Sequence, residues 1–260
     1  MYPDSKASYK GVTPDSFKLN ARDINYRKRY FMSRDGIKLA LMTASIIVGD
    51  VLNLDSEDFE IELIDDVKKE WVSSHIKQVK SSSWGTKTSP KIIINLAKIS
   101  DFSKEFEDKE ENKKYAQYLE LWKIICMELR YSYQYIIMDT YAINVSFGTK
   151  KELQLESKET CLKWIGALEH YKKNNINLDL GDENINFLDY DSSVFAYYIL
   201  DALGLIEVKY PYELKKVKEF VSSFRRRYNK KLKKSLQSLK YTPQEIFEND
   251  GKLSGFRFRS

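Results

Sequence analysis

The sequence predicts an α+β fold: a helix-rich single domain with a small sheet and a long basic helix near the C-terminus. Three observations predict this class. Apolar residues recur every three or four positions over several long stretches, whereas only a few short β-branched runs lie between turn residues. The chain has 260 residues, of which 42% are hydrophobic and 31% charged, so it can bury a sizeable core without disulfides. Residues 209–240 contain twelve Lys or Arg and only two Glu, which predicts the basic helix.

The N-terminal quarter is expected to hold an arm, one helix and one strand. Residues 1–22 mix Pro, Gly, Ser and Asp without periodicity and are predicted to form a flexible arm. A basic and aromatic patch follows at 25–31. Helical spacing of apolar residues predicts a helix over 37–51, and loose alternation predicts a strand over 59–64.

The middle of the chain is predicted to alternate between helix and strand. Apolar residues on one helical face predict a helix over 67–79. The clearest strand is 91–96, which is short, β-branched and preceded by Pro90. The run 115–139 lacks Gly and Pro and predicts a long central helix, whereas 142–147 predicts another short strand.

The C-terminal part is predicted to be helical, with helices over 158–171, 192–203 and 211–241. Apolar residues step by three or four through the last of these: Leu214, Val217, Val221, Phe224, Tyr228, Leu232, Leu236 and Leu239. This stripe has two open interpretations, because it would pack either on the same domain or on a second subunit. A homodimer through the 212–240 helix is therefore one arrangement to test.

The chain is expected to have three parts, the arm (1–22), an α+β domain (23–205) and the basic helix with its tail (206–260). The first residues lack a basic patch followed by an apolar run, and polar residues interrupt the longest apolar stretch, so we expect neither a signal peptide nor a membrane span. Cys126 and Cys161 have no C-x-x-C spacing and suit a reducing compartment. We therefore expect a cytoplasmic protein.

Two stretches resemble a known family. Residues 127–134 read M-E-L-R-Y-S-Y-Q, which resembles the H-E-L-R-H-x-Y-Q version of the H-E-x-x-H helix in bacterial and mobile-element zincin-like metallopeptidases. Residues 187–196 resemble the P-I-E-I-D-A-x-A-F-A stretch of those proteins. The resemblance implies a zincin-like core over about 59–205 and an origin in a phage or other mobile element. It also implies that Asp189 occupies the position of the third metal ligand.

The residues at the other family positions argue against zinc chemistry. A catalytic zinc needs two imidazoles one helical turn apart, but Met127 and Tyr131 stand there. Without a metal, Glu128 has no acidified water to act on, so we treat it as a vestigial position and expect no catalytic residue, metal or cofactor. The chain has two histidines, His75 and His170, and neither lies near Glu128 in sequence. Each is expected to be an ordinary surface or core residue.

The clustered cations point instead to a polyanion. They could neutralise phosphates, and aromatic residues beside the cations of 25–31 offer stacking faces. A Lys-rich outer face is also common on helices that are simply solvated. The candidate nucleic-acid-binding residues are Arg27, Lys28, Arg29, Arg225, Arg226, Arg227, Lys230, Lys231, Lys233 and Lys234.

Three functional hypotheses stay open. The first is a non-catalytic zincin-like protein that binds an unidentified protein partner and has a polyanion-contacting basic helix. The second is a nucleic-acid-binding protein that acts through residues 209–240 and 26–31. The third is an enzyme with an unrecognised site, for which the sequence offers the least support.

Overall fold

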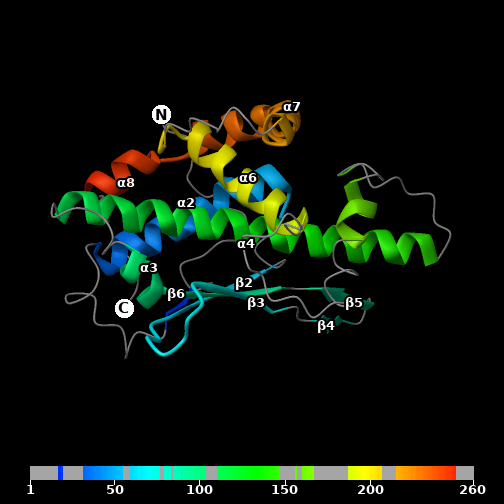
Figure 1. The fold of residues 1–260 in the computed structure, drawn as a ribbon, viewed down its shortest axis with the longest axis horizontal. Helices are drawn as coiled ribbons and strands as arrows, with labels where there is room; N and C mark the ends of the chain where they lie inside the picture. Colours follow the sequence, from blue (N-terminus) through cyan, green and yellow to red (C-terminus); the bar gives the residue numbers. More distant parts are fainter. Residues whose placement is uncertain are drawn as a thin grey trace, which may run out of the picture.

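The computed structural model has two layers, a small sheet and a layer of helices on one of its faces (Figure 1). The structure describes residues 17–19, 32–54, 59–76, 79–82, 85–88, 90–102, 110–146, 156, 160–166, 187–206 and 215–249. The larger sheet has the strand order β1-β2-β6-β3, with β1 at Phe17–Leu19, β2 at Glu60–Ile64, β6 at Lys91–Asn95 and β3 at Ser73–Ile76. A separate pair joins β4 (Val79–Ser82) to β5 (Gly85–Thr88). The predicted helix-rich α+β class is confirmed.

The alternation of side chains orients the four-stranded sheet. Strands β1, β2 and β6 are parallel, and β3 is antiparallel to β6. Ile61 and Leu63 of β2 and Ile92 and Ile94 of β6 are buried, because alternate residues of a strand point to the same face and this face meets the helices. Strand β3 ends the sheet on one side and contacts helix α4 (Glu110–Ser146).

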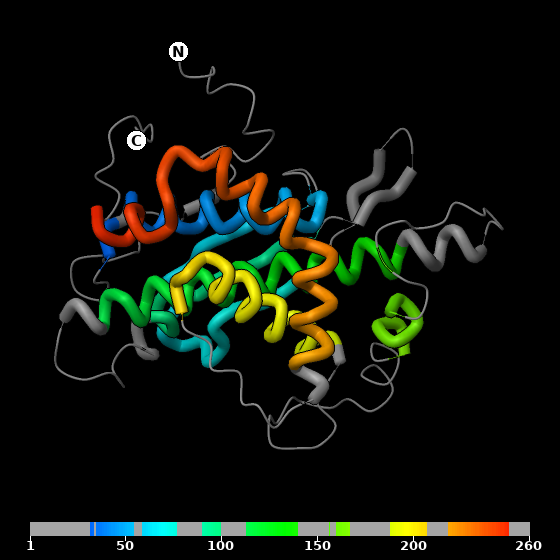
Figure 2. Tube along the Cα trace, turned by 90° about the horizontal axis from the view of Figure 1, so that it is seen from above, coloured from blue at the N-terminus to red at the C-terminus, as the bar shows by residue number. Residues whose placement is uncertain are grey.

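Helix α4 is the central helix and runs along the length of the helical layer (Figures 1 and 2). The helices that pack most extensively against it are α2 (Arg34–Leu52) and α6 (Phe187–Ala202). Helix α7 (Lys215–Ser238) lies across α2 and α6, and α8 (Pro243–Asn249) returns to α2. A short helix, α3 (Leu96–Phe102), follows β6 directly.

Local sequence determines several helix ends. The Ser33 hydroxyl accepts a hydrogen bond of 3.0 Å from the Gly36 amide and so caps the start of α2. Asn53 ends that helix with a φ of 55°, a left-handed conformation that Asn tolerates better than most residues. Before α8, Thr242 and Glu245 exchange backbone-to-side-chain hydrogen bonds, which is a capping box.

The helix predicted over 67–79 is wrong. Strand β3 occupies Ser73–Ile76, and β4 begins at Val79. The apolar spacing matched a helix, but this segment pairs with β6, and the Asn95 amide donates to the Val72 carbonyl at 2.8 Å. Long-range strand pairing therefore outweighs the local periodicity.

Two further predictions fail in part. The strand predicted over 142–147 is wrong, because α4 continues as a helix to Ser146 and no described strand pairs with this run. The predicted arm is wrong at 17–19, where β1 pairs in parallel with β2 and so belongs to the sheet. The rest of 1–22 and the whole patch at 25–31 lie outside the described residues.

The other element predictions are confirmed, with the observed elements longer at several ends. The predicted helices 37–51 and 115–139 lie within α2 and α4, and the predicted helix 192–203 extends one residue beyond the end of α6. Within the helix predicted over 211–241, residues 215–238 form α7. The predicted strands 59–64 and 91–96 correspond to β2 and β6, which are each one residue shorter. Of the helix predicted over 158–171, residues 160–166 are described and helical. Within the described part of the chain, every helix is too short or too polar to cross a membrane. The division at 205 stays a prediction.

Candidate functional site

One face of α7 is used to hold the helix on the domain. Val221, Phe224, Tyr228 and Leu232 are buried at spacings of three and four, as expected for one face of an amphipathic helix. Phe224 packs edge-on against Phe195 of α6, with ring centroids 5.5 Å apart. The apolar stripe predicted from the sequence therefore packs within the same chain, which leaves these residues no exposed surface for a second copy.

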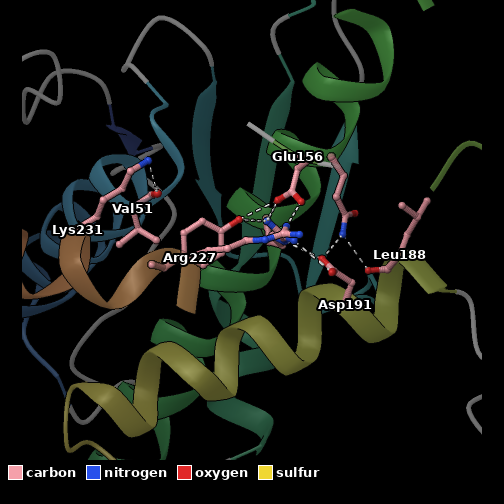
Figure 3. A network of polar contacts seen from close by, with 9 residues as sticks. Val51, Glu156, Leu188, Asp191, Arg227 and Lys231 are labelled. Atoms are coloured by element: carbon pink, nitrogen blue, oxygen red, sulfur yellow. Dashed lines mark hydrogen bonds and ion pairs between the residues drawn. The ribbon is translucent and has the colours of Figure 1, made fainter. Parts of the chain in front are cut away.

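Arg130 of α4 organises a buried polar network beneath this face. Figure 3 shows Asp191, Glu156 and Arg227 converging in this network. Its guanidinium donates to both carboxylate oxygens of Asp191, at 2.6 and 3.2 Å, and to the Tyr228 hydroxyl at 3.0 Å. The Arg130 side chain is 1% exposed. Burial alone would lower the pKa of Arg130, but the charge of Asp191 opposes this and the pKa lies well above its ordinary value. The cation is therefore fixed in its charged form.

Glu156 completes the network from a different part of the chain. Its carboxylate accepts hydrogen bonds from the Tyr228 hydroxyl at 2.9 Å and from Arg227, and it lies 3.5 Å from the Arg130 guanidinium. Gln134 donates to Asp191 at 2.7 Å. Two cations and two carboxylates thus face one another and their charges balance, with Arg227 as the half-buried member.

Two of the predicted nucleic-acid-binding residues point inward. Arg227 pairs with buried Glu156. Lys231 donates to the Asn53 side chain at 2.9 Å and to the Val51 carbonyl at 3.4 Å, at the C-terminus of α2 (Figure 3). A cation complements the helix dipole there, and burial lowers the pKa of Lys231. Both residues attach α7 to the domain, so they are poorly placed to reach an external phosphate.

The other five predicted cations of α7 are exposed. They are Arg225, Arg226, Lys230, Lys233 and Lys234. Arg225 lies 3.6 Å from Asp201, yet its side chain stays 56% exposed. Within α7 the single acid is Glu219, among ten Lys or Arg. The structure thus separates the basic residues of the helix into an inward pair and an outward group.

The N-terminal members of the predicted site cannot be placed beside this group. Arg27, Lys28 and Arg29 lie outside the described residues. We therefore define the candidate interface as the outer face of α7, meaning Arg225, Arg226, Lys230, Lys233 and Lys234.

A second polar cluster surrounds Glu128, on the side of α4 that faces the sheet. Ser73 donates to one carboxylate oxygen of Glu128 at 2.7 Å, and His75 Nδ1 lies 3.2 Å from the other. The His75 ring stacks on Tyr135 and meets Tyr131 edge-on, with centroids 5.2 and 6.3 Å away. His75 is therefore a partner of Glu128, a contact that the sequence analysis did not predict.

The sequence contained a signal for this cluster. Ser73 and His75 are two residues apart, so on a strand they share a face, whereas the incorrect helix over 67–79 would have separated them. Among the described residues His75 Nε2 has no hydrogen-bond partner.

The residues predicted to stand at former metal positions, Met127, Tyr131 and Asp189, lie around the same cluster. Burial raises the pKa of Asp189 to about 6, with a further contribution from the negative charge of Glu128, which places the two carboxyl groups in one neighbourhood. Met127 and Tyr131 are half-buried and pack against the hydrophobic core. Among the described His, Cys, Asp and Glu residues, no group of three or more could hold a metal ion. The two stretches that resemble zincins are packed together, through the contacts of Arg130 and Gln134 with Asp191.

Comparisons with known proteins found nothing similar. No protein-family model, no curated protein and no solved structure matches this chain.

Proposed function

We propose that this protein is a non-catalytic binding protein that contacts a polyanion through the outer face of α7, with nucleic acid as the expected class. The observation that supports this most strongly is the single sign of the exposed charges from 225 to 234, where five cations and no acid face solvent. Arg227 and Lys231 contact residues of the same chain, and the proposal does not depend on them.

A purely solvated face would not need this charge pattern. Arg226, Lys230 and Lys234 are spaced four residues apart, so neighbouring like charges repel along one side of the helix. Each such pair destabilises a helix by roughly 0.2–0.5 kcal/mol. The negative charges of a bound polyanion would replace this repulsion with a net attraction. They would also attract the cationic face before contact is made.

The zincin-like core is part of the proposal. The contacts between Arg130 and Asp191 and between Gln134 and Asp191 support it, because they join the two stretches that resemble the family. The replacement of both motif imidazoles supports a binding role without peptidase activity. A phage or mobile-element origin is proposed on the resemblance alone, and an unidentified protein partner remains compatible with this core.

Charge reversal on the outer face of α7 tests the function. We expect the triple variant Arg226→Glu, Lys230→Glu and Lys234→Glu to bind a labelled nucleic acid at least about 100-fold more weakly at 0.1 M salt, since each lost phosphate contact removes roughly an order of magnitude in affinity. Fluorescence anisotropy over a series of salt concentrations measures this. These side chains are exposed, so circular dichroism should show an unchanged fold.

A matched control separates the interface from net charge. The variant Lys68→Glu, Lys69→Glu and Lys163→Glu reverses three exposed cations elsewhere. Both triple variants change the formal net charge from +5 to −1, because each reversal subtracts two. Equal loss of binding in the two variants, or no loss in either, would contradict the proposal.

A further inference from the structure

The exposed face of α7 lacks the aromatic residues that single-stranded nucleic acid would need. The helix contains three aromatic residues, Phe220, Phe224 and Tyr228. Phe224 and Tyr228 are buried, and Phe220 is half-buried, with its ring 5.4 Å from that of Tyr190. Proteins that hold single strands combine a basic groove with aromatic faces on which bases stack, each stack contributing roughly 1–3 kcal/mol. The described part of α7 therefore offers charge without a stacking surface.

The exposed cations form a ridge along the helix axis. Arg226, Lys230 and Lys234 follow one another every fourth residue, and Lys233 lies beside them. At about 1.5 Å per residue, the eight steps from residue 226 to residue 234 span about 12 Å. One strand of a B-form duplex presents a phosphate about every 3.4 Å along its axis, so about three or four phosphates lie within this length.

The exposed residues are better suited to phosphates than to bases. Bidentate contacts to purines come from Arg or Lys at guanine and from Asn or Gln at adenine. Arg225 lies against Asp201, and the Asn229 side-chain oxygen accepts a hydrogen bond of 2.8 Å from Tyr198. The remaining ridge is mostly Lys, whose compact ammonium suits a phosphate as a point charge. Sequence readout from this face should therefore be weak.

We propose that the outer face of α7 binds double-stranded nucleic acid through the phosphates of its backbone, in preference to single strands and with little dependence on base sequence. This inference rests on the proposed function and specifies its ligand. About four phosphate contacts give a slope of log affinity against log salt of about −3.6 on a duplex. Affinity should then fall by about 10²-fold between 50 and 200 mM salt.

The test compares three labelled probes with the full chain: a 20-base-pair DNA duplex, one of its single strands, and a duplex of scrambled sequence. Anisotropy titrations at several salt concentrations are expected to give a duplex affinity at least about 10-fold above that of the single strand. The scrambled duplex should bind within about 3-fold of the original, since phosphate contacts carry no sequence information. The triple variant at Arg226, Lys230 and Lys234 should lose duplex binding, and the Lys68, Lys69 and Lys163 variant should retain it.

The outcomes distinguish a failure of the duplex preference from a failure of polyanion binding by α7. Equal or tighter binding of the single strand, or a more than about 10-fold effect of scrambling, overturns the duplex inference and leaves the proposed function standing, provided that the α7 variant loses binding. The proposed function itself fails if none of the three probes binds. It also fails if the wild type and the α7 variant bind the duplex and the single strand equally well.

Discussion

Arg130 and Glu128 lie two residues apart on α4, yet their surroundings differ in charge balance. Arg130 faces α6 and α7 in a network where two cations meet two carboxylates. Glu128 faces β3, where Ser73 and His75 contact it and where Asp189 adds a second acidic group. The first region is closed and balanced, whereas the second has an excess of acid and an imidazole nitrogen without a partner among the described residues. The first region thus behaves as a structural scaffold, whereas the second brings two acidic groups close to one imidazole.

The largest effect should come from breaking the balanced region. We expect Arg130→Met to lower the free energy of unfolding by about 3–5 kcal/mol, because it leaves Asp191 and Glu156 buried without their shared cation. Urea denaturation measures this loss. Arg226→Met is the control, since it removes an exposed Arg from α7 and should change stability by no more than about 0.5 kcal/mol. Similar effects of the two substitutions would show that the network is not a stability determinant.

Neutralising a carboxylate should change the free energy of unfolding in opposite directions in the two regions. The pKa of Asp189 is raised from 3.8 to about 6 in the folded protein, so its ionisation disfavours folding as pH rises through this interval. Asp189→Asn removes that cost and should stabilise the protein above pH 6, by on the order of 1 kcal/mol after allowance for partial solvent exposure. The gain should vanish below about pH 4, where the carboxyl group is protonated in both states.

Asp191→Asn is the matched comparison, because it removes a carboxylate that pairs with Arg130 and should destabilise the protein at pH 7. Thermal unfolding of both variants at pH 4 and pH 8 measures the contrast. Destabilisation by both substitutions at pH 8 would mean that Asp189 is paired as favourably as Asp191.

The smallest effect should come from the hydrogen bond between β3 and α4. Ser73→Ala removes a donor to Glu128 and should cost about 0.5–1.5 kcal/mol of unfolding free energy. Ser74→Ala is the control on the opposite face of the same strand. If the two variants are equally stable in urea, the contact of Ser73 with Glu128 contributes nothing measurable.

Sequence reasoning succeeded where the signal was local. The three- and four-residue spacing of Val221, Phe224, Tyr228 and Leu232 was sufficient to identify the inner face of α7. It could not separate Arg227 from its exposed neighbours, because the partner of Arg227 is Glu156, which lies 71 residues away in a segment without a recognisable pattern. Periodicity identifies a face, but it does not identify the distant residue that faces it.

The same limit explains why the contact between His75 and Glu128 was not predicted. Val72, Ile76 and Val79 recur at helical intervals, so a local pattern favoured a helix over 67–79. The competing arrangement depends on a strand that begins at Lys91 and on a helix that carries Glu128. Neither is visible in a short window. Once β3 is known, the shared face of Ser73 and His75 follows directly.

The Arg130 network also has a consequence for the order in which the protein assembles during its synthesis. Arg130 depends on Tyr228, which is made 98 residues later. At a translation rate of roughly 5–20 residues per second, α4 precedes this partner by about 5–20 s. We therefore expect the nascent chain to hold an incomplete core, and the native packing to form only after α7 has emerged from the ribosome.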